Sequence, residues 1–128
     1  MSVRTTAEVI DRFNHAFVAH DREALADVVG ADCVMEAIQP APAGERVEGR
    51  DACLAWWGAL VEDRTSQFEP TDVVIAGERA TILWRYRFGD GPADWVAGAN
   101  VMRVRDGVIV EALGFGKSAG EVPLATDS

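Results

Sequence analysis

Cysteine is scarce in this chain, and its scarcity excludes two classes of small protein. The 128 residues hold two cysteines, Cys33 and Cys53. They are too few and too far apart for a disulfide framework or a cysteine-rich zinc site. His15 and His20 are five residues apart, a poor spacing for two ligands on one helix face. We therefore expect no metal site and two cysteines that act as small buried hydrophobes.

Positive charge and long apolar runs are also in short supply. Lys and Arg total 12 against 21 Asp and Glu, which gives a net charge of −9. A field of this sign opposes binding to nucleic acid and to anionic membranes. The N-terminal residues lack the apolar core of a secretory signal, and no run approaches membrane-spanning length. We expect a cytoplasmic protein that has neither nucleic acid nor membrane as a partner.

Helical patterns fill the first half of the chain. Thr5 or Thr6 can cap a helix that reaches residue 19, because apolar residues then recur at helical spacing. A short helix over 22–29 is expected to end at Gly30, in the position that helix ends favour. A third helix is expected over 50–62. The segment 39–48 is rich in proline and glycine and is typical of a loop.

Strand patterns dominate the second half. Glycine-bearing turns separate the last strands, and Asp-Gly at 106–107 is a strong hairpin signal. The expected strands cover 33–38, 67–76, 79–88, 94–105 and 108–116. This order predicts one α+β domain over 1–128, with helices on one side of a curved, mostly antiparallel sheet. Its core would span about 7–116, and 117–128 would be a flexible tail.

The strand over 82–88, with the sequence ILWRYRF, has two very different faces. Successive side chains of a strand point to opposite sides, so the aromatic residues share one face and Arg85 and Arg87 share the other. If the arginine face meets water, the strand is ordinary and amphipathic. If that face lines a cavity, two guanidiniums could bind an anionic or carbonyl-bearing ligand.

Four segments, in this order and spacing, carry a family resemblance: AEVIDRFNHAFVAHDREAL, GADCVMEA, EGRDACLAWW and NVMRVRDGVIVEALGFG. The chain resembles the nuclear transport factor 2-like superfamily, in particular its SnoaL-like polyketide cyclase and ketosteroid isomerase-like branch. The likeness covers about 7–116. It implies a cystatin-like cone, in which a bent sheet wraps three N-terminal helices around a deep apolar pocket. Many relatives form dimers through the outer face of this sheet.

The resemblance also implies an orientation for the strand over 82–88. Alignment through Asn100 and Met102 turns Leu83, Arg85 and Arg87 toward the pocket. The outward residues would then form a homodimer surface: Trp84, Tyr86 and Phe88. The opposite orientation packs the aromatic residues on the helices and leaves the arginines in water.

The catalytic residues of the relatives are only partly matched. The carboxylate base of the isomerases falls on Ala37 and their tyrosine on Phe13, whereas their acid donor falls on Asn100, whose amide can still donate. The arginine of the epoxide hydrolases is matched by Arg85, but their aspartates are not matched. The remaining candidate bases are Glu36, which needs a bulge to face inward, and Glu111.

The expected pocket is apolar and aromatic, with Arg85, Arg87 and Asn100 as donors. Its other lining residues would be Phe13, Phe17, Met35, Trp56, Leu83 and Val96. The resemblance implies a cofactor-independent isomerase, cyclase or dehydratase that acts on a hydrophobic aromatic or polyketide-like substrate with a carbonyl or carboxylate. Arg85 and Asn100 would stabilise an oxyanion, with Glu36 or Glu111 as the base. The alternatives are a binding protein that uses the same pocket without chemistry, and a dimeric interaction module whose pocket is plugged.

Overall fold

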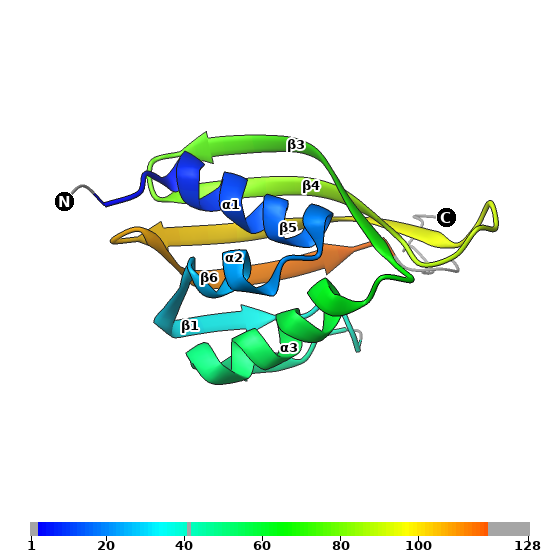
Figure 1. Cartoon of the computed structure of the whole chain (residues 1–128), viewed down its shortest axis with the longest axis horizontal. Helices are drawn as coiled ribbons and strands as arrows, with labels where there is room; N and C mark the ends of the chain where they lie inside the picture. Colours follow the sequence, from blue (N-terminus) through cyan, green and yellow to red (C-terminus); the bar gives the residue numbers. More distant parts are fainter. Residues whose placement is uncertain (1–2, 41, 118–128) are drawn as a thin grey trace, which may run out of the picture.

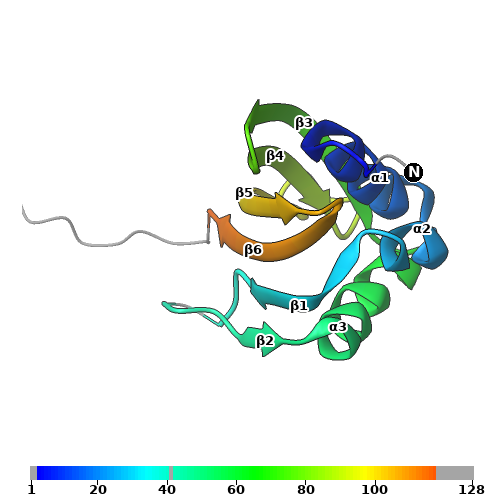
Figure 2. The ribbon, with the colours of Figure 1, turned by 90° about the vertical axis from the view of Figure 1, so that its left-hand side faces the viewer.

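Three helices lie on the concave face of one six-stranded sheet in the computed structural model (Figures 1 and 2), which describes residues 3–40 and 42–117. The elements are α1 (Thr6–Ala19), α2 (Arg22–Ala26), β1 (Val29–Glu36), β2 (Arg46–Glu48), α3 (Arg50–Glu62), β3 (Gln67–Ala76), β4 (Arg79–Arg87), β5 (Trp95–Arg105) and β6 (Val108–Gly116). The predicted α+β class, with a curved sheet wrapped around the helices, is confirmed. Apart from Lys117, the expected tail lies outside the described residues.

The sheet is mixed, with strand order β2-β1-β6-β5-β4-β3. β1 runs parallel to β6, and every other neighbouring pair is antiparallel. Figure 2 shows that the helices cover one face and leave the other face open. The interior between the helices and the sheet is therefore the place where a ligand can be enclosed. No helix of the described residues is long and apolar enough to cross a membrane.

A capping box fixes the start of α1. The Thr5 hydroxyl accepts a hydrogen bond from the Glu8 amide at 3.1 Å, and the Glu8 carboxylate accepts one from the Thr5 amide at 2.8 Å. These bonds hold the pKa of Glu8 below its ordinary value. From this start, helical spacing brings one apolar stripe to the sheet, which buries Val9, Ile10, Phe13, Ala16 and Phe17.

Two sequence predictions for the segment after α1 were wrong. The second helix ends at Ala26, and Gly30 lies inside β1 instead of capping that helix. A Cβ at Gly30 would lie 2.9 Å from the Ile109 carbonyl and from a Val108 methyl group. Glycine therefore serves the close approach of β1 to β6. The expected loop over 39–48 also contains the short strand β2.

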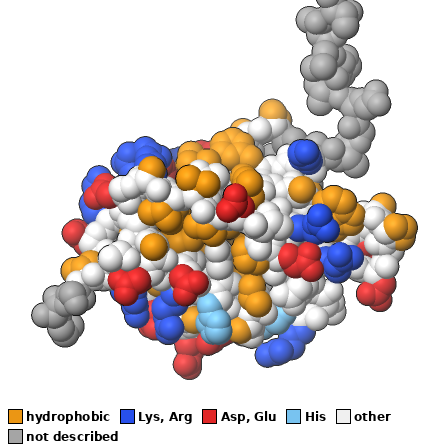
Figure 3. Space-filling view, turned by 90° about the horizontal axis from the view of Figure 1, so that it is seen from above, with side chains coloured by type: hydrophobic (Ala, Val, Ile, Leu, Met, Phe, Trp, Pro, Cys, Tyr) orange, Lys and Arg blue, Asp and Glu red, His pale blue; other side chains and the backbone are white. Residues whose placement is uncertain are grey.

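β3 forms one edge of the sheet, and its second half is exposed. Val73, Val74 and Ile75 are 38%, 56% and 39% exposed, although they are apolar and consecutive. Figure 3 views the molecule from the β3 side and shows hydrophobic side chains in the middle of this surface, with charged side chains around them. The helices do not cover this end of the strand.

The inner face of β5 depends on Gly98, which pairs with Trp84 on one side and with Gly116 on the other. A Cβ at Gly98 would collide with the Trp84 ring and the Phe115 carbonyl. We therefore expect Gly98→Ala to lower the free energy of unfolding by about 1–3 kcal/mol, measured by urea denaturation. Gly116→Ala is the matched control, because its Cβ would meet only the flexible Ile38 side chain at 3.2 Å. Equal losses for both variants would contradict this account.

Candidate functional site

A cavity of about 250 Å³ lies between the helices and the inner face of the sheet. Its volume is slightly below the range that is typical of small-molecule pockets, roughly 300–1,000 Å³. Most of its wall is aromatic or aliphatic, and its lining residues are Phe13, Phe17, Met35, Glu36, Ala37, Ile38, Gln39, Trp56, Trp57, Leu60, Phe68, Trp84, Tyr86, Val96, Asn100, Ala112 and Gly114. A molecule of a few fused or linked rings suits this space.

β4 turns its aromatic face toward the cavity, which is opposite to the predicted orientation. Side chains directly opposite each other in an antiparallel pair share one face. Asn100 of β5 stands opposite Ile82, so Ile82 and Trp84 point inward, and both are buried. Leu83 is 42% exposed and lies on the outer face. The prediction that Leu83, Arg85 and Arg87 line the pocket was therefore wrong.

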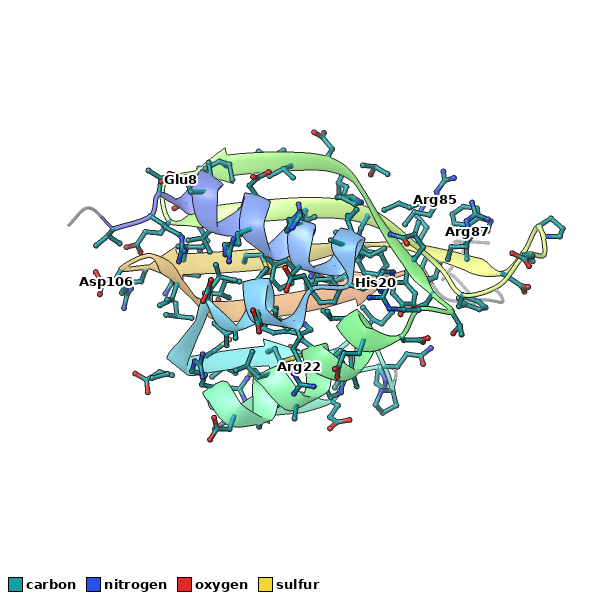
Figure 4. All side chains as sticks on the ribbon, viewed as in Figure 1. Glu8, His20, Arg22, Arg85, Arg87 and Asp106 are labelled. Carbon is teal, nitrogen blue, oxygen red and sulfur yellow. The ribbon has the colours of Figure 1, made fainter. Side chains whose placement is uncertain are left out.

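Both arginines are engaged on the outer side of the sheet. The Arg85 guanidinium lies over the Trp95 ring, 4.6 Å from its centroid, and Arg87 Nε lies 4.0 Å from a carboxylate oxygen of Glu69. Figure 4 shows the two side chains at the end of the sheet that carries the β4–β5 hairpin, away from the helices. Neither guanidinium can meet a ligand inside the cavity. The predicted homodimer surface of Trp84, Tyr86 and Phe88 is also wrong. Trp84 and Tyr86 line the cavity, and of the three only Phe88 is exposed.

The other predicted pocket residues do lie at the cavity: Phe13, Phe17, Met35, Trp56, Val96, Asn100 and, at its border, Glu36. Sequence reasoning missed Trp84, Tyr86 and Phe68 as lining residues. The alternation over 82–88 already placed Trp84 and Tyr86 on one shared face, and the choice between faces was the error.

Ring-to-ring contacts join the aromatic wall into one continuous surface. Ring centroids lie 4.9 Å apart for Phe13 and Phe17, 5.3 Å for Phe17 and Phe68, and 6.2 Å for Phe68 and Trp84. Trp57 meets Phe13 edge-on at 5.3 Å. These tilted and edge-on arrangements are the favoured ones for aromatic pairs. The wall is therefore preorganised for a flat apolar ligand.

Asn100 places one polar group in this apolar wall. The Trp84 indole N–H donates to Asn100 Oδ1 at 3.1 Å, and Asn100 Nδ2 makes no hydrogen bond to any of the described residues. An indole N–H can only donate, so oxygen is the amide atom that must face it. The NH₂ group of Asn100 is thereby left as a donor for a ligand.

Tyr86 supplies the second polar group and is held from outside the cavity. Its hydroxyl lies 2.6 Å from the Ser66 hydroxyl, which also donates to the Asp63 carbonyl at 3.2 Å. Asp63 caps the C-terminus of α3, and its carboxylate accepts bonds from the Thr65 hydroxyl and amide. These bonds lower the pKa of Asp63 from its ordinary value. A continuous set of hydrogen bonds thus runs from the cavity wall to the end of α3.

The two carboxylates considered as bases point away from the cavity. The Glu36 carboxylate lies 3.2 Å from the Arg46 guanidinium, across the β1–β2 pair. The register of β1 with β6 is regular at Glu36, so the bulge that would turn its side chain inward is not there. The Glu111 carboxylate lies 3.5 Å from the Arg79 guanidinium. The polar side chains that remain at the cavity are therefore neutral, namely Asn100, Tyr86 and the exposed Gln39.

The cysteines are buried neighbours in the core. Cys53 Sγ lies 3.4 Å from the Cys33 carbonyl oxygen. Burial, with a smaller contribution from Cys53, raises the pKa of the Cys33 thiol, and burial also raises that of Cys53. Neither thiol is a ready nucleophile, because the thiolate is the reactive form. Within residues 3–40 and 42–117, no group of three or more His, Cys, Asp or Glu side chains is placed to hold a metal ion.

Comparison with solved structures identifies the fold. The chain is similar to an NTF2-like protein of unknown function from Mesorhizobium loti, with a TM-score of 0.83 and 45% identity, covering 88% of this chain and 91% of that chain. It is also similar to a "putative polyketide cyclase" from Sinorhizobium meliloti, with a TM-score of 0.67, 24% identity, and 83% and 92% coverage. A "putative ketosteroid isomerase" from Kribbella flavida gives a TM-score of 0.75 at 20% identity, with 94% and 83% coverage. At these lower identities the last two likenesses show the fold alone.

Family membership follows from the match to a family model, although none of the curated proteins compared with the chain matches it. The family model described as a SnoaL-like domain matches residues 10–112, which is most of the chain. The resemblance noted in the sequence is thereby confirmed, and the protein is a member of the SnoaL-like family with an NTF2-like fold.

Proposed function

We propose that this protein binds a neutral, mainly apolar small molecule in its cavity and that Asn100 donates a hydrogen bond to a carbonyl-like acceptor on it. The observation that carries the proposal is the bond from the Trp84 indole to Asn100 Oδ1. It leaves the amide NH₂ as a donor for a ligand, in a wall that is mainly apolar and aromatic. A few well-placed polar groups in an apolar cavity are typical of small-molecule sites.

Charge complementarity favours a neutral ligand. Arg85 and Arg87 are occupied on the outer face by Trp95 and Glu69. An anion that moved from water into the cavity would find no cation to pair with there, and burying an unpaired charge costs several kcal/mol. The free-energy cost of removing a neutral ketone from water is far smaller. The ligand is therefore expected to be a ketone, aldehyde or ester on a flat hydrophobic frame.

Matched ligands test this proposal. We expect tetralone, a neutral bicyclic ketone, to bind at least about tenfold more tightly than naphthoate, a carboxylate of similar size, because the carboxylate finds no cation. Asn100→Leu should weaken tetralone binding about five- to tenfold through loss of the donor. Titration followed by tryptophan fluorescence measures both, since three tryptophans line the cavity. Arg85→Ala, on the outer face, is the control and should leave both affinities unchanged; tighter naphthoate binding that Arg85→Ala abolishes would contradict the proposal.

Cofactor-independent isomerase-, cyclase- or dehydratase-type catalysis on the same carbonyl compound is a second candidate. It is favoured by the Asn100 donor, which could stabilise an enolate oxygen in a largely water-free site. The nearest carboxylate is Glu36, which borders the cavity but is paired with Arg46. Rotation of that partly exposed side chain away from Arg46 would be needed before it could remove a proton.

Proton exchange tests this second candidate. If Glu36 acts as a base, the protein should accelerate exchange of the hydrogens next to the tetralone carbonyl with deuterated water, measured by NMR. Glu36→Gln should reduce the acceleration at least about tenfold, within the range of general base catalysis, while tetralone affinity stays unchanged. The matched control is Glu111→Gln, because Glu111 lies outside the cavity lining. Exchange no faster than in buffer would leave ligand binding without chemistry as the function.

We also propose that the protein forms a homodimer through the outer face of the sheet. Leu83 and Phe115, 42% and 56% exposed, flank Ala99 in register across β4, β5 and β6. Val101 and Leu113 continue this apolar strip in the next cross-strand row. Such a strip is unfavourable in water and is complementary to a second copy of itself across a two-fold axis. The strip replaces the one first expected from Trp84, Tyr86 and Phe88.

Charge reversal tests the dimer. We expect Phe115→Glu to convert the dimer to monomer, measured by sedimentation equilibrium at micromolar concentration, because two carboxylates would face each other near the axis. Val18→Glu is the control, since Val18 is 45% exposed on α1, outside the sheet. A wild-type protein that is monomeric at this concentration would rule out the dimer.

A further inference from the structure

We propose that the ligand also carries a hydroxyl or N–H group, which donates to the Tyr86 oxygen at the end of the cavity opposite Asn100. This inference rests on the proposed binding function and narrows its ligand class. It follows from the direction of the hydrogen bonds that hold Tyr86. The cavity would then recognise a flat hydroxyketone, with an acceptor at one end and a donor at the other.

The direction of these bonds is set by Ser66, which has one hydroxyl proton and two partners. One partner is the Asp63 carbonyl, 3.2 Å away, which can only accept. The proton of Ser66 is therefore used there, and in the 2.6 Å contact the donor is the Tyr86 hydroxyl. Ser66 is 6% exposed, so water has little access to change this arrangement.

The reverse arrangement would be less favourable. If Ser66 donated to Tyr86, the Asp63 carbonyl at the end of α3 would lose its hydroxyl donor and keep the longer bond from the Ser66 amide, at 3.5 Å. The Tyr86 proton would then point into a mainly apolar cavity. Buried polar groups without partners are costly, whereas the chain Tyr86 to Ser66 to Asp63 pairs each proton. Toward the cavity, Tyr86 thus presents lone pairs and acts as an acceptor.

The spacing of the two polar groups sets the length of the ligand. Asn100 stands opposite Ile82, which lies four residues before Tyr86 on β4. At roughly 3.3 Å per residue the two backbone positions are about 13 Å apart along the strand. Both side chains line the same cavity, and from this backbone separation we infer that their polar atoms meet different ends of a ligand. A carbonyl and a hydroxyl on the same end of a ring system could not satisfy both.

Three related ketones test the inference: unsubstituted tetralone, a hydroxytetralone with its hydroxyl on the ring position farthest from the ketone, and the methyl ether of that hydroxytetralone. The wild-type protein should bind the hydroxytetralone about five- to tenfold more tightly than the other two, in titrations followed by tryptophan fluorescence. Tyr86→Phe should abolish this preference. Ser66→Ala should free the Tyr86 proton, so that the methyl ether gains affinity relative to the hydroxytetralone.

The outcomes separate this inference from the proposed function. Equal binding of the three ketones by the wild-type protein would overturn the acceptor role of Tyr86 and leave the binding function intact. A hydroxyl preference that persists in folded Tyr86→Phe protein would overturn it too. Failure of all three ketones to bind would overturn both proposals. The wild-type comparison decides the question even where a variant does not fold, which circular dichroism would reveal.

Discussion

The burial of the β4 aromatic face against α1 is the contact on which the rest of the site depends. Because a strand has only two faces, burying Ile82 and Trp84 also places Tyr86 at the cavity and sends both arginines outward. The same packing brings the Trp84 indole onto Asn100, which fixes the orientation of the amide. One choice of face thus determines the shape, the charge and the hydrogen-bonding groups of the cavity.

Neutrality is the property that distinguishes this cavity from one built around charged catalytic groups. The charged side chains near the cavity are paired on the outside of the molecule: Glu36 with Arg46, and Glu111 with Arg79. The inner wall keeps polar groups whose protons are already directed by neighbours. Such groups discriminate between ligands by the direction of a hydrogen bond, because a mismatched ligand leaves a buried donor or acceptor unpaired.

The sequence was sufficient for the order of elements and insufficient for the orientation of β4. Apolar spacing predicted α1, α3 and the last strands closely, because periodicity reports burial directly. Both faces of β4 carry bulky side chains, and the choice between them required the pairing of Ile82 with Asn100, a long-range fact that local pattern does not contain. Gly30 was misassigned for a similar reason, since a helix end and a close approach of strands both favour glycine.

The uncovered end of β3 has a consequence for how the protein behaves in crowded solution. Three consecutive β-branched apolar residues, Val73 to Ile75, stand on the last strand of the sheet, where backbone amides and carbonyls lack a further neighbour. Such an edge can recruit a strand from another molecule. Asp72, Glu78 and Arg79 flank it with charge and are exposed. These charges make the addition of a strand from another molecule unfavourable. The solubility of the protein therefore depends on these side chains staying ionised.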